Sequence, residues 1–223
     1  MSNVIEITSI SRNGQHAICN WICKQLTNQQ TIFENHVFVV DRNKKIGKTN
    51  TIKYNQENKQ VGLTVKLFEN YFDKIENKII LLRDPYNWLA SLLHSCKRTE
   101  KTLKEYIKKY IDLHDNIKSC KFFINYNKWF DDINYRKEIC SNLNLSFTDN
   151  GLGDVVMFGN GSSFDLRKMD GNGDKMKVLE RWKFVIENNS PNITKDEFIA
   201  ILKSNNEINC IAEKTFNMKK ITQ

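Results

Sequence analysis

The chain is poor in the features that would assign it at once to a specialised class. Only two of its 223 residues are proline, and no proline-rich linker or composition break divides it, so we expect a single domain over residues 1–223. No apolar run approaches the roughly 18 residues of a membrane-spanning helix, and the N-terminus lacks the pattern of a signal peptide. Six cysteines include no C-x-x-C pair, which argues against a zinc or redox motif. These absences predict a cytoplasmic protein with reduced thiols and no membrane span.

Hydrophobicity and charge narrow the class further. Hydrophobic residues make up 40% of the chain, which is enough for a sizeable core. The formal net charge of +8 favours an anionic ligand such as a nucleotide or an acidic glycan. The basic residues are dispersed, with no run of five or six, so a specific nucleic-acid site is not expected. No pattern in the sequence indicates an oligomeric state.

The first segment with chemical content follows the first predicted strand. Val4–Ile10 is a short β-branched run typical of a buried strand, and apolar residues recur at helical spacing over Ala17–Leu26. The turn between them places backbone N–H groups at a helix N-terminus, where the helix dipole favours an anion. Arg12 adds a planar cation, and Gly14 permits close backbone approach. The G-K-[ST] of a Walker A loop is absent. The segment predicts anion capture, with a purely structural turn as the alternative.

A second segment repeats this arrangement. Ile79–Leu82 is typical of a buried strand, and helical spacing follows over Tyr86–Cys96. Asp84 is a favourable N-cap, and proline follows it at the first helical position. Arg83 would leave the carboxyl end of a strand, where open parallel sheets bind ligands, and Ser91 would lie two turns into the helix. Arginine and a hydroxyl can hold one phosphate together; the alternative is a capped helix without a ligand.

The rest of the chain alternates predicted strands and helices. This alternation predicts an α/β fold in three layers, with a central, mostly parallel sheet and helices on both faces. Further strands are predicted at His36–Val40, Val61–Leu67 and Lys121–Ile124, an exposed loop at Asp41–Lys59, and further helices at Phe68–Ile75, Thr102–His114, Asn134–Leu143, Met176–Glu187 and Lys195–Ser204, the last of which is expected to finish the chain.

Glycine is concentrated in a third segment. Six of the nine glycines lie between Asn150 and Gly173, where they indicate close backbone approach or a mobile loop. The segment contains the run Gly159-Asn160-Gly161-Ser162-Ser163-Phe164-Asp165, and Glu180-Arg181-Trp182 follows it.

Together the three segments resemble those of the sulfotransferases that use 3′-phosphoadenosine 5′-phosphosulfate (PAPS). In that family a strand-to-helix loop holds the 5′-phosphosulfate, and an arginine followed eight residues later by a serine holds the 3′-phosphate. Arg83 and Ser91 reproduce this step, and Ser11–Ala17 is most similar to the bacterial and viral-type S-R-x-G-x-H-A core. The resemblance implies a P-loop-like sulfotransferase fold, with PAPS as donor, adenosine 3′,5′-bisphosphate (PAP) as product and no metal.

Catalysis of sulfuryl transfer requires groups that neutralise the transferring group and a base that takes the proton of the acceptor. Arg12 and His16 suit the first role. Two carboxylates are candidates for the base: Glu69, which follows the third predicted strand, and Asp165, which lies in the late loop. The sequence does not decide between them, and Glu69 is taken as the candidate. The cofactor-binding residues that the resemblance implies are Arg12, Asn13, Gly14, Gln15, His16, Ala17, Arg83, Ser91, Ser162, Ser163, Phe164 and Arg167, with the two serines and Arg167 at the 3′-phosphate and Phe164 on the adenine.

Two positions depart from the cytosolic members of the family. Arg12 stands where those enzymes have a lysine, and Ala17 stands where they have an aromatic residue that stacks on adenine. The acceptor, a hydroxyl or amine of a small molecule or glycan, has no recognisable signature. A P-loop-type nucleotide kinase shares the opening strand–turn–helix, and a non-enzymatic anion- or nucleotide-binding protein would use the basic surface alone.

Overall fold

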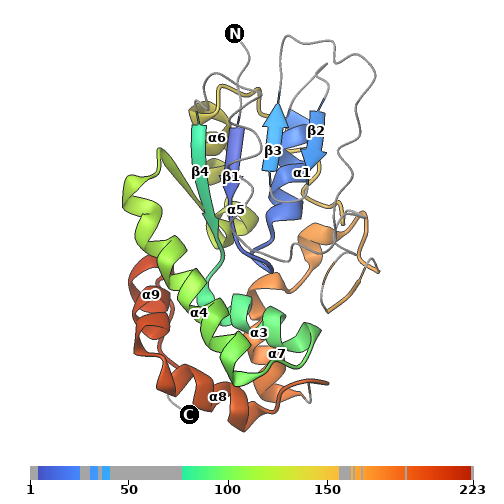
Figure 1. The fold of residues 1–223 in the computed structure, drawn as a ribbon. Helices are drawn as coiled ribbons and strands as arrows, with labels where there is room; N and C mark the ends of the chain where they lie inside the picture. The colour runs from blue at the N-terminus through green and yellow to red at the C-terminus, as the bar shows by residue number, and fades with distance from the viewer. Residues whose placement is uncertain are drawn as a thin grey trace.

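The described part of the chain forms an α/β structure around three parallel strands (Figure 1). β1 (Ile5–Thr8), β4 (Asn77–Leu82) and β5 (Phe122–Asn125) hydrogen-bond in the order β1-β4-β5. β2 (Thr31–Glu34) and β3 (Val37–Val40) pair as an antiparallel hairpin on the β1 side. The computed structural model describes residues 5–25, 31–34, 37–40, 77–155, 162, 164–166, 168–188 and 190–221.

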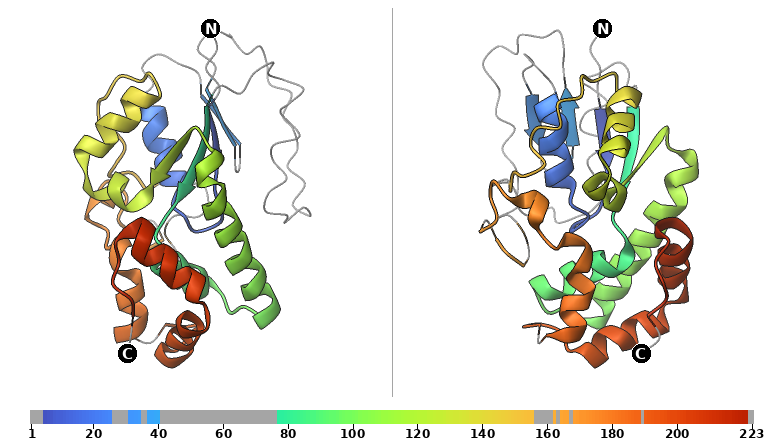
Figure 2. Two further views of the ribbon diagram at one scale, coloured as in Figure 1. Left: turned by 90° about the vertical axis from the view of Figure 1, so that its left-hand side faces the viewer. Right: turned by 180° about the vertical axis from the view of Figure 1, so that it is seen from behind.

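Helices cover both faces of the three-stranded sheet (Figure 2). α1 (Gln15–Gln25), α5 (Tyr126–Asp131) and α6 (Ile133–Asn142) lie on one face, and α4 (Glu100–Asp115) lies on the other. The α/β class predicted from the sequence is therefore confirmed. Beyond the carboxyl ends of the strands, at the bottom of Figure 1, lie α3 (Pro85–Ser95), α7 (Arg181–Glu187), α8 (Lys195–Ser204) and α9 (Asn206–Phe216).

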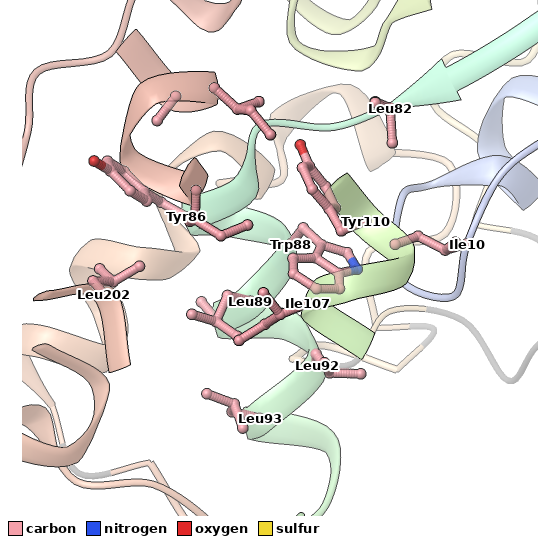
Figure 3. Packing of buried hydrophobic residues seen from close by; sticks show 14 of the residues in the cluster. Ile10, Leu82, Tyr86, Trp88, Leu89, Leu92, Leu93, Ile107, Tyr110 and Leu202 are labelled. Atoms are coloured by element: carbon pink, nitrogen blue, oxygen red, sulfur yellow. The ribbon is translucent and has the colours of Figure 1, made fainter. Parts of the chain in front are cut away.

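The larger hydrophobic cluster surrounds α3, in which every residue from Pro85 to Leu93 is buried. Trp88 of α3 packs against Tyr110 of α4, with their ring centroids 4.5 Å apart. Figure 3 shows this pair from close by. The polar atoms of both rings reach backbone: Trp88 Nε1 donates to the Ser11 carbonyl at 3.0 Å, and the Tyr110 hydroxyl donates to the Arg83 carbonyl at 2.5 Å. The core thus fixes the loop after β1 and the first residue after β4.

A second cluster fills the opposite face of the sheet. Successive strand side chains point to opposite faces, so Ile79 and Leu81 of β4 join this cluster while Ile80 and Leu82 join the first. Trp21 of α1 is fully buried in the second cluster. Its indole contacts that of Trp129 edge to face, with centroids 6.0 Å apart. β4 is therefore packed between two apolar layers.

The helix after β4 begins as the sequence predicts. Asp84 caps α3, its side chain accepting the Asn87 N–H at 2.8 Å, and Pro85 takes the first helical position. The first helix begins at Gln15 rather than Ala17, because Gly14 already accepts the first helical hydrogen bonds, from the N–H groups of Ala17 and Ile18.

Four other expectations differ from the structure. No strand was expected at Thr31–Glu34, which is β2, and no helix at Tyr126–Asp131, which is α5. The predicted helix Met176–Glu187 is helical only from Arg181, after two 3₁₀ turns. Lys195–Ser204 does not finish the chain, because α9 follows it. Three predicted segments lie outside the described residues: Asp41–Lys59, Val61–Leu67 and Phe68–Ile75.

No helix in the described ranges is both long enough and apolar enough to cross a membrane.

Candidate anion-binding site

The segments after β1 and β4 meet at one edge of the sheet, because these strands are parallel neighbours with Thr8 opposite Ile80. Asn13 joins the two segments. Its Nδ2 donates to the Leu81 carbonyl at 3.4 Å, and its Oδ1 accepts the Arg83 N–H at 3.3 Å. The Asn13 side chain is fully buried, so this contact is part of the core. The two segments singled out from the sequence thus lie side by side.

The loop before α1 has an unusual backbone. Arg12 and Gly14 both have positive φ, at 74° and 82°, a region that residues with a Cβ rarely adopt. A Cβ on Gly14 would lie 2.6 Å from Cδ2 of the Tyr126 ring, so only glycine fits. Arg12 is half-buried. Burial lowers its pKa, and its neighbours include Cys96 and the like-charged Arg98.

Arg83 lies at the centre of the site. Its side chain is 1% exposed, Nη1 donates to the Ser91 hydroxyl at 3.3 Å, and the guanidinium carbon lies 5.3 Å from the centroid of the Tyr126 ring. Nε and Nη2 are buried and have no hydrogen-bond partner within the described part of the chain. Burial lowers the pKa of Arg83, because a desolvated cation loses its hydration energy.

The neighbouring carboxylate, Asp84, raises the pKa of Arg83 against the effect of burial but forms no ion pair with it. Asp84 Oδ1 accepts the Asn87 N–H at 2.8 Å, and Oδ2 accepts the side-chain amides of Asn87 and Asn127, both at 2.9 Å. These neutral donors hold the carboxylate at the cap of α3. No ion pair joins Arg83 to a carboxylate among the described residues. The donors that remain on Arg83 suit an anion brought from outside the chain.

A second arginine, Arg181, converges on the same serine. Its Nη1 donates to the Ser91 hydroxyl at 2.9 Å and its Nη2 to the Ser162 hydroxyl at 2.8 Å. Desolvation and then the charge of Arg83 lower the pKa of Arg181 to about 9. Arg181 is part of the Arg-Trp pair that follows the third segment in the sequence, and it was not among the expected site residues. Its contact with Ser91 joins residues 90 positions apart in the sequence, so no local spacing pattern predicts it.

The late segment packs against Arg181. Phe164 stacks on His94 of α3 with ring centroids 3.9 Å apart, and the Arg181 guanidinium carbon lies 5.0 Å from the centroid of the Phe164 ring. The Ser162 hydroxyl accepts the N–H groups of Phe164 and Asp165 and donates to the Asp165 carboxylate at 3.2 Å. The role of Phe164 at adenine stays a prediction, and its ring already has His94 and Arg181 as neighbours here.

The other candidate residues divide into two groups. Gln15, His16 and Ala17 form the first turn of α1, with Ala17 packed against the second hydrophobic cluster. Their roles stay predictions. Ser163, Arg167 and Glu69 lie outside the described residues. In the part of the chain that is described, no three histidine, cysteine or carboxylate side chains form a group that could hold a metal ion.

Fold and site together define an α/β protein with a buried cationic centre beyond the carboxyl ends of parallel strands. No protein-family model, no curated protein and no solved structure matches this chain. The assignment of function therefore rests on the site.

Proposed function

We propose that this protein is a sulfotransferase with a P-loop-like fold that transfers a sulfuryl group from PAPS to a hydroxyl or amine of a small-molecule or glycan acceptor. The observation that carries the proposal is Arg83, a buried guanidinium with two nitrogens that have no partner among the described residues. It shares the hydroxyl of Ser91, eight residues on, with Arg181. This arginine–serine step is the one in which the sequence resembles the family.

These residues suit the 3′-phosphate of the donor. A dianion there would accept hydrogen bonds from Arg83, Arg181 and Ser91, and charge-assisted bonds of this kind are about twice as strong as neutral ones. It would also compensate the buried charge of Arg83. The free nitrogens of Arg83 have no exposed surface, so access requires a neighbour to shift. Arg181 is half-buried, whereas Ser91 and Tyr126 are buried, so Arg181 is the neighbour that we expect to move.

The loop before α1 suits the other end of the donor. An anion at a helix N-terminus is stabilised by the helix dipole, and the close packing of Gly14 against Tyr126 fixes the backbone there. Arg12 and His16 would stabilise the negative charge that develops as the sulfuryl group leaves. Asp165 is hydrogen-bonded to Ser162 beside Arg181, which associates it with the 3′-phosphate. This position favours Glu69 as the base.

The decisive measurement is thermal unfolding with and without PAP. A ligand at 100 times its Kd stabilises the folded state by about 2.7 kcal/mol, so we expect a clear rise in Tm with PAP and a smaller one with adenosine 5′-monophosphate. No rise with PAP would refute the proposal. A rise with Mg²⁺-ATP alone would instead favour a nucleotide kinase.

A second measurement separates an enzyme from a binding protein. Labelled sulfate transfer from PAPS should be screened over glycans, phenols and amines with the wild-type protein and Arg12→Ala. We expect transfer to one acceptor class and its loss in the variant. Binding of PAP without transfer to any acceptor would indicate a non-enzymatic nucleotide-binding protein.

A further inference from the structure

Asn87 connects the helix that carries Ser91 to the chain on both sides of Arg181. Its side chain is fully buried. Nδ2 donates to the Leu179 carbonyl at 2.9 Å, and Oδ1 accepts the Trp182 N–H at 3.3 Å. Both bonds go to backbone, two residues before Arg181 and one residue after it. A single side chain thus holds the main chain from which Arg181 extends.

The helical spacing explains why this contact serves the anion site. Residues four apart on a helix lie on the same face, so Asn87 and Ser91 both face the start of α7. Asn87 binds the backbone around Arg181, and one turn further on Ser91 accepts the guanidinium of Arg181 at 2.9 Å. Fixing an arginine side chain in one place costs up to about 2 kcal/mol of conformational entropy. Because the backbone around Arg181 is already held in place, less of this entropy is lost when the ligand binds.

The orientation of the Asn87 amide is itself fixed. Nδ2 faces two acceptors, the Leu179 carbonyl and Asp84 Oδ2, while Oδ1 faces the Trp182 N–H. Only this assignment of the amide satisfies all three partners. Asp84 is held in turn by Asn127 of α5, whose Nδ2 donates to Oδ2 at 2.9 Å and whose Oδ1 accepts the Asp84 N–H at 3.2 Å. The hydrogen bonds therefore run without a break from α5 through the cap of α3 to the start of α7.

We propose that Asn87 is a positioning residue for Arg181: it makes no contact with the anion and sets the place of the guanidinium that does. The inference rests on the proposed function insofar as Arg181 binds the 3′-phosphate of PAP.

The test is a double-mutant cycle on the full chain, with PAP affinity measured by calorimetry. Arg181→Ala removes a charged hydrogen-bond donor, which weakens binding by about tenfold or more. Asn87→Ala is expected to weaken binding to a similar extent. The variant with both changes is expected to bind no more weakly than Arg181→Ala alone, because there is no guanidinium left to position.

Asn209→Ala is the matched control. Asn209 is also a buried amide against α3, accepting the Tyr86 hydroxyl at 2.9 Å and donating to the Leu202 carbonyl at 2.8 Å, but it touches neither side of Arg181. Its loss should lower Tm and leave PAP affinity unchanged. If Asn87→Ala does not fold, Asn87→Ser serves in its place, with the same expected loss of affinity.

A second readout needs no ligand. Phenylglyoxal modifies accessible arginines, and mass spectrometry gives the rate at Arg181. We expect a several-fold faster reaction in Asn87→Ala and no change in Asn209→Ala. Three outcomes would each overturn the inference. They are wild-type PAP affinity in Asn87→Ala, additive losses of affinity in the double-mutant cycle, and an unchanged labelling rate at Arg181. If wild-type protein does not bind PAP but the labelling rate rises as expected, the positioning role stands and the proposed function fails.

Discussion

At the scale of single residues, two buried arginines in the described part of the chain have opposite surroundings. Arg136 is 6% exposed and forms a bidentate ion pair with Asp149, at 2.7 and 2.9 Å. Arg83 is 1% exposed and has two nitrogens without a partner among the described residues. A buried charge without a partner is costly, and removing one member of a buried ion pair is costly because it leaves the other in that state. Arg136 therefore has a structural role, whereas Arg83 makes one side-chain hydrogen bond among the described residues, from Nη1 to Ser91, and leaves its other two nitrogens without a partner there.

The two arginines should respond in opposite ways to the same substitution. Arg83→Met is expected to raise the unfolding free energy of the ligand-free protein by about 1 kcal/mol or more, and to abolish stabilisation by PAP. Arg136→Met leaves the half-buried Asp149 carboxylate without its cation, although the Trp21 indole N–H still donates to it at 3.1 Å, and should lower the unfolding free energy by up to about 3 kcal/mol. Urea unfolding with and without PAP measures both. A clear loss of ligand-free stability in Arg83→Met would show that Arg83 is a structural residue.

Gly14 and Gly171 offer a second matched pair. Both have positive φ, at 82° and 80°, so alanine at either position is strained by about 1 kcal/mol. Only Gly14 also faces a buried ring, that of Tyr126, while a Cβ on Gly171 would meet nothing within 4 Å. Overpacking adds about 1–3 kcal/mol. We expect Gly14→Ala to lower Tm much more than Gly171→Ala and to weaken PAP binding; equal changes in Tm would contradict the packing argument.

At the scale of elements, α3 carries the site at both of its ends. Asp84 caps its start beside Arg83, and His94 in its last turn supports Phe164. The Nδ1 atom of His94 lies 3.1 Å from the Ser190 hydroxyl. Desolvation and then the charge of Arg181 lower the pKa of His94 from 6.5, against the opposing effect of Asp165. The neutral form of the histidine is thus favoured under the late segment.

This shift gives stability a definite pH dependence. Because the pKa of His94 is lower in the folded state, the unfolded chain binds the proton more readily once the pH falls below about 6.5. The stabilisation is present above that pH and is lost as the pH falls toward the folded-state pKa. We expect wild-type Tm to drop more than that of His94→Gln between about pH 7.5 and about pH 5. Parallel curves for the two proteins would contradict the role of His94.

Local signals predicted those elements whose boundaries have local causes. The strand before Arg83, the Asp84 cap and the proline after it specified the start of α3 from a few neighbouring residues. The break between α8 and α9 is a single residue, Asn205, with neither glycine nor proline to mark it, and α9 was missed. Arg181 was missed as a site residue because its place depends on α7 packing against α3, where Asn87 accepts the Trp182 N–H and Ser91 accepts the Arg181 guanidinium N–H.

At the scale of the whole molecule, the two hydrophobic clusters share one strand. Alternate residues of β4 belong to opposite clusters, Ile79 and Leu81 to one and Ile80 and Leu82 to the other. Neither layer of helices can leave the sheet without exposing apolar side chains of a strand that the other layer also covers. The site lies where this shared strand ends, so its geometry depends on both clusters.

Sharing of this kind predicts that the described part of the chain unfolds as one unit; the single domain expected from the sequence stays a prediction. The tryptophans can report each cluster separately, since Trp21 and Trp129 lie in one cluster while Trp88 lies in the other with Trp182 packed against it. A variant with phenylalanine at positions 21 and 129 keeps Trp88 and Trp182 and reports the cluster around α3. A variant with phenylalanine at positions 88 and 182 keeps Trp21 and Trp129 and reports the cluster that contains α1. In each variant we expect the urea transition seen by fluorescence to coincide with that seen by far-ultraviolet circular dichroism. A fluorescence transition that precedes the loss of helix in either variant would show that one cluster opens on its own, and the protein would then have to be treated as two cooperative units with the anion site between them.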